Sequence, residues 1–107
     1  MPLFHVGGIM RSTLAPALSG GAVVAMRHVD ADAFWRNVVA FSATWYYSSP
    51  TIHRAYFHAH VRASADATTL RLVANAAGPL APEMATQMRD TYSPRRARGA
   101  SSCPRTA

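Results

Sequence analysis

Short apolar, β-prone segments alternate with amphipathic segments between residues 7 and 92, and this alternation constrains the fold more than any other feature of the sequence. Buried strands are predicted at residues 22–26, 44–48 and 70–76, which are rich in β-branched, aromatic or small apolar residues. Apolar residues recur every three or four positions elsewhere, which predicts helices at residues 7–19, 31–41, 50–62 and 82–92. Strands that alternate with helices favour a parallel sheet with helices on its faces. We therefore predict an α/β fold, with an incomplete parallel sheet of about three strands and flanking helices.

Several residues mark where these elements begin and end. Asp30 precedes the second helix and is a candidate N-cap, and Pro50 stands where the third helix begins. The first helix ends at the Gly20–Gly21 pair. Pro16 lies late in that helix, where we expect it to kink or shorten the helix.

The positive charge is concentrated at the end of the chain. Residues 1–92 contain seven Arg and five acidic residues, whereas residues 93–107 contain four Arg and no acidic residue. The latter segment also lacks aromatic residues and periodicity, so we predict a folded domain at residues 1–92 and a disordered, Arg-rich tail at residues 93–107. Such a tail favours at most weak, nonspecific binding of nucleic acid or anionic surfaces, and we do not expect nucleic acid as a functional partner.

Composition excludes several classes of site. The chain has no Lys, which excludes a Schiff-base lysine and a phosphate-loop lysine. Its single cysteine, Cys103, excludes a disulfide framework and a cysteine-based zinc site. No apolar run approaches the length of a membrane span and no signal peptide is recognisable, so we expect a cytoplasmic protein.

Three motifs in order carry a resemblance to a known superfamily. They are PLFHVGG at residues 2–8, the segment from DADAFW at residue 30 to the proline and threonine at residues 50–51, and NAAGPLAPEM at residues 75–84. In this order and spacing they resemble the middle of the large N-terminal domain of the adenylate-forming, or AMP-binding, enzymes. The acyl-CoA synthetase branch, which has a PLFHxxG motif, is the most similar.

The resemblance implies an ATP-dependent ligase. In such enzymes a carboxylic acid, such as a fatty or other acyl acid, reacts with ATP to give an acyl-adenylate. The acyl group is then transferred to the thiol of CoA or phosphopantetheine. The cofactors implied for the complete enzyme are therefore ATP, Mg²⁺ and CoA or phosphopantetheine.

The resemblance also implies site residues. His5 matches the motif histidine of the carboxylate pocket, and Gly7 matches a small residue that opens the next helix. Thr51 and His53 follow the second predicted strand, so we expect them on the same substrate-binding rim. The nucleotide-binding loop that borders adenine corresponds to Asn75, Ala76, Ala77, Gly78 and Pro79. We predict no catalytic residue and no metal ligand in this chain.

Other parts of the family pattern are not found in this sequence. These are the Ser/Thr/Gly-rich phosphate loop that should precede PLFH, the GYGxTE motif that should follow residue 92, and the catalytic lysine. Phosphate chemistry depends on positioning and on charge neutralisation. We therefore expect a fragment of such an enzyme that is inactive alone, so that its status as an enzyme is uncertain. The alternative is a non-catalytic remnant or a small basic interaction protein.

The remaining histidines and aromatic residues have simpler interpretations. His58 and His60 are two residues apart on a helix, where they cannot chelate one ion well, and we interpret the histidines of this helix as surface residues. Trp35, Trp45 and their tyrosine neighbours are interpreted as core residues.

Overall fold

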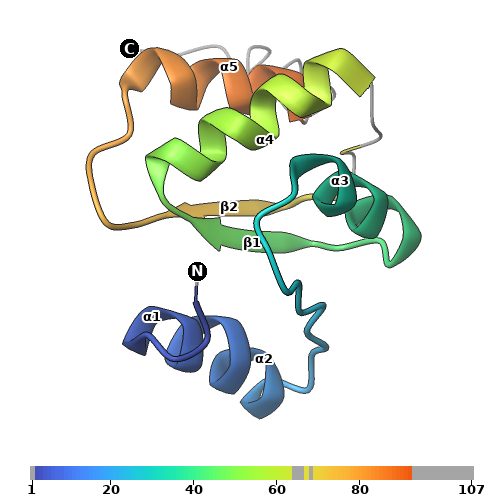
Figure 1. Cartoon of the computed structure of the whole chain (residues 1–107), viewed down its shortest axis with the longest axis vertical. Coiled ribbons are helices and arrows are strands. Elements are labelled where there is room, and N and C mark those ends of the chain that lie inside the picture. The colour runs from blue at the N-terminus through green and yellow to red at the C-terminus, as the bar shows by residue number, and fades with distance from the viewer. Residues whose placement is uncertain (1, 64–66, 68, 93–107) are drawn as a thin grey trace, which may run out of the picture.

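The strands β1 (Trp45–Ser48) and β2 (Leu72–Asn75) lie side by side in the computed structural model, which describes residues 2–63, 67 and 69–92 (Figure 1). They run parallel, with Trp45 opposite Leu72 and Ser48 opposite Asn75. Helix α4 (Pro50–Ala63) makes the crossover that a parallel pair requires. The prediction of a parallel α/β arrangement is confirmed.

The remaining elements are helical and follow the predicted order. They are α1 (Val6–Ile9), the π-helix η1 (Met10–Leu14), α2 (Ala15–Leu18), α3 (Ala31–Ala40) and α5 (Pro82–Tyr92). No helix in the described part of the chain is long and apolar enough to cross a membrane.

The strand predicted at residues 22–26 is wrong. This segment is a loop without strand pairing, and Val23 and Val24 are 44% and 42% exposed. The sheet formed by the described residues has two strands, which leaves this segment without a neighbour to accept its backbone hydrogen bonds. An apolar, β-branched composition favours a strand only where such a neighbour is present.

Pro16 does not end the first helix, because the helix widens before it. Ala15 donates its backbone N–H to the carbonyl of Met10, five residues earlier, and Ser19 then donates to Ala15 at 3.1 Å. A proline inside a regular α-helix clashes with the carbonyl four residues before it and cannot donate to it. The π-helical turn at Met10–Leu14 accommodates this proline, and helical structure continues to Leu18.

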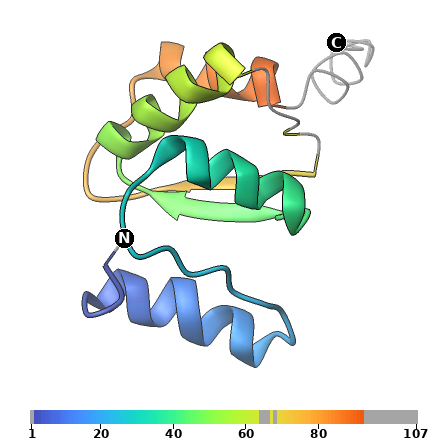
Figure 2. The same ribbon diagram turned by 45° about the vertical axis from the view of Figure 1, so that its right-hand side comes forward.

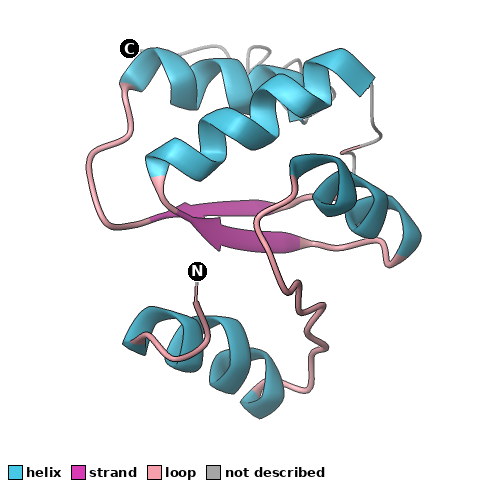
Figure 3. Ribbon diagram, in the orientation of Figure 1, coloured by secondary structure: helices cyan, strands magenta, loops and turns pink. Residues whose placement is uncertain are grey.

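Helices lie on both sides of the sheet, but the two layers differ. α3, α4 and α5 cover one face, while α1, η1 and α2 lie on the other, as Figures 1 and 2 show from two directions and Figure 3 shows by element type. The core belongs to the first layer. In the second layer Phe4 and Leu18 are 89% and 86% exposed. The N-terminal layer therefore contributes little buried apolar surface.

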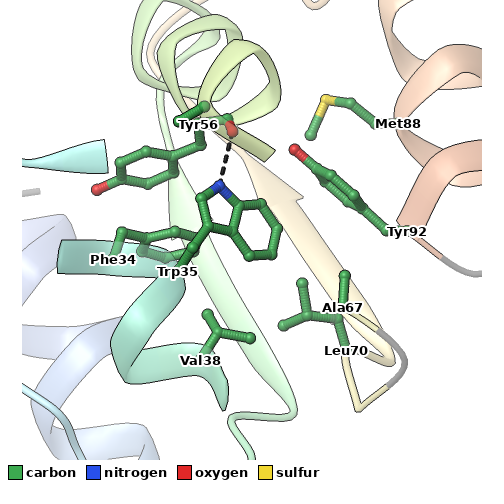
Figure 4. Packing of buried hydrophobic residues seen from close by; sticks show 9 residues of the cluster. Phe34, Trp35, Val38, Tyr56, Ala67, Leu70, Met88 and Tyr92 are labelled. Carbon is green, nitrogen blue, oxygen red and sulfur yellow. Dashed lines mark hydrogen bonds between the residues drawn. The ribbon is translucent and has the colours of Figure 1, made fainter. Parts of the chain in front are cut away.

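An aromatic cluster joins α3 to α4 and the sheet (Figure 4). Phe34 stacks on Tyr56 with a ring-centroid distance of 3.8 Å. Phe34 also forms edge-to-face pairs with Trp35 and with Tyr46. The Trp35 indole Nε1–H donates a 2.7 Å hydrogen bond to the carbonyl of Tyr56. The prediction that Trp35 belongs to the core is confirmed.

His60 lies inside this core, so its interpretation as a surface residue is wrong. Its ring lies 4.6 Å from Trp35 and 5.0 Å from Tyr92, measured between centroids. Burial lowers the pKa of His60 below its ordinary value, because the charged ring would lose its hydration. His58 is exposed, as predicted.

We expect Phe34→Ala to destabilise the fold by about 3–5 kcal/mol, the usual cost of deleting a buried aromatic ring. Phe41→Ala is the matched control, because Phe41 directly follows α3 and is 64% exposed. Its effect should stay within about 0.5 kcal/mol. Urea unfolding followed by tryptophan fluorescence measures both changes, and equal losses for the two variants would contradict the described core.

Acidification is expected to destabilise the protein through His60. The folded-state pKa of His60 lies below that of the unfolded chain, which is about 6.5. The unfolded state therefore binds the proton first, and stability that is present above about pH 6.5 is lost as the pH falls through the folded-state pKa. Unfolding free energies at about pH 7.5 and about pH 5.5 measure the loss. It should be smaller in His60→Gln and unchanged in the control His58→Gln.

Candidate functional site

The carboxyl ends of β1 and β2 lie next to each other and bring two of the predicted site segments together. Ser48 and Asn75 are the last paired residues of the two strands. Pro50 begins α4 directly after β1, and Thr51 lies exposed in its first turn. A Cβ built on Gly78 would lie 3.8 Å from Cγ of Pro50, so the segment at residues 75–79 borders this turn. Ligands of parallel α/β sheets bind at this edge.

The segment at residues 75–79 folds into a closed turn. The Ala76 N–H donates to the carbonyl of Ser48 at 3.0 Å, which continues the strand pairing by one residue. The Asn75 side-chain amide then donates to the carbonyl of Gly78 at 2.8 Å. Ala77 has φ 61° and Gly78 has φ 155°, both outside the usual range of residues with a side chain. The turn thus presents backbone and small side chains to solvent.

His5 and Gly7 lie at the start of α1, on the other side of β1. His5 is the N-cap of this helix, and its Nδ1 accepts a 3.2 Å hydrogen bond from the Gly7 N–H. A Cβ on Gly7 would lie 3.2 Å from the Tyr47 hydroxyl, so this residue packs against the third residue of β1. Because Nδ1 accepts this bond, Nε2 is the ring nitrogen that can donate a hydrogen bond. The exposed His5 ring therefore offers one hydrogen-bond donor.

The surroundings of Gly8 explain why the second glycine of the PLFHVGG motif carries no side chain. A Cβ at this position would collide with the carbonyl of Pro2, because the chain before α1 folds back over the helix. The His5 N–H donates to the same carbonyl at 3.2 Å. A side chain at residue 8 would therefore displace the turn that positions His5.

Thr51 and His53 were predicted on one rim, but the structure places them in different environments. Thr51 is exposed, whereas His53 is fully buried beneath the first turn of α4. Its Nδ1 lies 3.1 Å from the Tyr46 hydroxyl. The buried His53 ring has no surface that a substrate can contact in this conformation, and its interpretation as a surface histidine is wrong.

Burial shifts the pKa of both groups in this pair. It lowers the pKa of His53, and the backbone at Ala74 and Ser48 opposes part of that shift. It raises the pKa of Tyr46 well above its ordinary value, and the neighbouring Tyr92 and Tyr56 act in the same direction. At neutral pH the pair therefore consists of an uncharged imidazole and a protonated phenol.

Tyr46 was not predicted as part of the site. Strand composition identifies it as a core residue, but not as the partner of a histidine seven positions later. The sequence pattern that could have indicated this pair is an aromatic residue in a strand, followed by a short connection and then a histidine in the first turn of the next helix.

The described residues at the strand ends can bind and orient a ligand, but they carry little charge. They offer backbone groups, the Thr51 hydroxyl and the Asn75 amide, whereas the His5 ring belongs to the start of α1. No group of three His, Cys, Asp or Glu side chains within residues 2–63, 67 and 69–92 could hold a metal ion. A shallow hollow of about 270 Å³ lies at the opposite end of the strands, lined by Thr44, Trp45, Arg71 and Leu72, and therefore away from all predicted site residues.

Comparison with known proteins decides the family. The sequence profile described as "AMP-binding enzyme" matches residues 1–98. The chain belongs to the AMP-binding enzyme family. A probable CoA ligase of Humulus lupulus and an oxalate–CoA ligase of Arabidopsis thaliana are each 30% identical to it over 95 residues. Each alignment covers 86% of this chain and 18% of the relative, so the chain spans about a fifth of the length of these relatives.

A shorter match has higher identity. A sulfoacetate–CoA ligase of Cupriavidus necator is 36% identical over 52 residues, which cover 49% of this chain and 10% of that protein. The resemblance read from the sequence motifs is thus confirmed at the level of the family. The match of the AMP-binding profile continues past residue 92, and the boundary proposed there stays a prediction. The roles of individual site residues also stay predictions.

The turn at residues 75–79 can be tested with two neighbouring substitutions. We expect Gly78→Ala to destabilise the protein by about 1–3 kcal/mol, because a side chain is strained at this φ although its nearest neighbour, Cγ of Pro50, would lie at an ordinary contact distance. Ala77→Gly should instead stabilise it or leave it unchanged, since glycine adopts φ 61° without a steric penalty. Thermal unfolding compares the two variants. A gain in stability for Gly78→Ala would contradict the described turn.

Proposed function

We propose that this chain forms part of the substrate and nucleotide wall of an ATP-dependent acid–thiol ligase. Such an enzyme joins a carboxylic acid to the thiol of CoA or phosphopantetheine through an acyl-adenylate. The observation that carries the proposal is the AMP-binding match across residues 1–98, together with relatives named as CoA ligases along 86% of the chain. The relatives named above include ligases of oxalate and of sulfoacetate, and for this chain we infer a carboxylic acid as the class of substrate.

The turn at residues 75–79 is suited to a flat, uncharged ring. Its exposed residues are small, its backbone is fixed at both ends by the hydrogen bonds of Ala76 and Asn75, and it lies at the ligand-binding edge of the sheet. We assign it to the adenine of the nucleotide. Thr51, exposed at the same edge, would border this position.

His5 is suited to an oxygen atom of the acid or of the acyl-adenylate. Its N-cap bond holds the ring through Nδ1 and leaves the Nε2–H free to donate. A single N–H donor can orient a carboxylate oxygen through one hydrogen bond. We therefore assign His5 a binding and orienting role.

The phosphates and Mg²⁺ of the proposed reaction do not fit the described residues. The sequence has no lysine, and the described residues form no cluster of metal ligands. Stabilisation of the charge that moves between the phosphates needs such groups. We propose that this chain alone binds the organic parts of the adenylate and does not catalyse its formation.

ATP–pyrophosphate exchange by the isolated chain should therefore stay at background, while a non-hydrolysable acyl-adenylate analogue should bind. We expect NMR shift changes at residues 5–8, 51 and 75–79. His5→Asn is the sharpest variant, because asparagine also caps a helix but lacks the imidazole donor. It should keep the thermal stability and weaken binding by roughly tenfold, which corresponds to one lost hydrogen bond of about 1.4 kcal/mol.

A variant that ends at Tyr92 is the control for the arginines of residues 93–107. It should bind the analogue as the full chain does. Binding that disappears in this variant, with shift changes absent from residues 75–79, would contradict the proposal and support a basic anion-binding protein. Exchange activity above background would contradict the proposed inactivity.

A further inference from the structure

His53 is unusual because it is a large polar side chain with no exposed surface. Among the described residues it is the largest side chain that is fully buried. It lies in the first turn of α4, and its backbone N–H donates to the carbonyl of Ser49 at 2.9 Å. A histidine is rarely buried to this extent unless its ring nitrogens are used.

The contacts of His53 reach both strands just before the turn at residues 75–79. Nδ1 lies 3.1 Å from the Tyr46 hydroxyl of β1, and the ring centroids are 5.4 Å apart. The backbone at Ser48 and at Ala74 acts on the ring, because it offsets part of the effect of burial on the pKa of His53. These are the last residue of β1 and the residue before the last of β2. His53 therefore lies where α4, β1 and β2 meet.

The surroundings of the ring favour its uncharged form. Burial and the positive end of the α4 helix dipole disfavour a charged ring, whereas the backbone at Ala74 and Ser48 offsets part of the effect of burial on the pKa of His53. From β1 the ring faces the uncharged Tyr46 hydroxyl. No Asp, Glu or Arg side chain within the described residues forms a hydrogen bond or ion pair with it, and its Nε2 has no partner there. Tyr46 stays protonated and can donate to Nδ1, provided that Nδ1 carries no proton.

Protonation would reverse this arrangement. Nδ1 would become a donor, so the Tyr46 hydroxyl would have to turn, and a positive charge would be buried at the start of a helix. The buried charge weakens the junction of α4 with the strand ends by more than the backbone at Ala74 and Ser48 restores, because burial is the larger effect on this ring. The turn at residues 75–79 depends on that junction, because the Ala76 N–H is bonded to the carbonyl of Ser48.

We propose that His53 is a positioning residue that, while uncharged, fastens the first turn of α4 to the carboxyl ends of β1 and β2 and so holds the turn at residues 75–79 in its binding shape. Acidification releases this junction before the whole domain unfolds. The importance of the turn for nucleotide binding rests on the proposed function, whereas the junction itself does not.

Amide hydrogen exchange of the full chain, measured by NMR without nucleotide, tests the proposal. The quantity to measure is the protection factor of the Ala76 amide divided by that of the Val38 amide inside α3. In the wild type this ratio should fall by up to about tenfold for each pH unit below about 6.5. In His53→Gln, which cannot titrate, the ratio should be lower at neutral pH and constant with pH.

His60→Gln is the matched control, because it removes the other buried histidine of α4 but leaves the junction intact. It should retain the wild-type fall of the ratio. A wild-type ratio that is constant with pH, or a fall that persists in His53→Gln, would overturn the proposal.

If His53→Gln does not fold, the wild-type His53 ring is titrated by NMR instead. The shifts of the amides at residues 76–78 must then follow the midpoint of that ring, and independent behaviour overturns the proposal. Failure of adenylate binding would count against the proposed function alone.

Discussion

The hydrogen bond from the Trp35 indole to the carbonyl of Tyr56 holds together the two helices on which the arrangement of this chain depends. Its acceptor belongs to Tyr56, the residue on which Phe34 stacks. The buried indole donor is therefore paired next to the contact between these two aromatic rings. α4 is the crossover between β1 and β2, and fixing it against α3 therefore also fixes the parallel pairing of the strands. Tyr92 extends the same cluster to α5, because its ring meets Trp35 edge to face.

The two halves of the candidate site are not packed equally well against the core. Its inner half, Thr51 and residues 75–79, begins directly at the ends of β1 and β2 and next to α4, close to the core. Its outer half, His5 and Gly7, belongs to the N-terminal layer, whose apolar side chains are mostly exposed. Tyr47 is a contact point between that layer and the sheet, because it borders Gly7 and lies under the guanidinium of Arg11 at 5.1 Å. The positions of Thr51 and residues 75–79 are thus set by the core, while the position of His5 depends on a few contacts around one tyrosine.

The sequence predicted the helices well and the environment of single residues less well. The helix at residues 31–41 was located within one residue, because Asp30 caps it with two hydrogen bonds and its apolar face is periodic. The failed strand at residues 22–26 has a suitable composition, but composition does not reveal whether a neighbouring strand is present. His53 and His60 were interpreted as surface residues because no pair of histidines on this helix has a spacing suited to a metal ion. Only the folded chain shows that Tyr46, Trp35 and Tyr92 enclose them.

The sequence predicted the edge of the sheet at which the candidate site lies. It did not predict which residues at that edge are exposed and which are buried beneath them. The rule that ligands bind at the carboxyl ends of parallel strands placed Thr51, His53 and residues 75–79 together. It does not distinguish a residue that faces the ligand from one that supports the residues that do. In the structure Thr51 faces outward and His53 faces inward, two positions later on the same helical turn, because residues two apart on a helix point in nearly opposite directions. A histidine on the inner side can influence a ligand only through the elements it holds together, and a fully buried ring in the first turn of α4 that is bonded to Tyr46 of β1 is suited to that task.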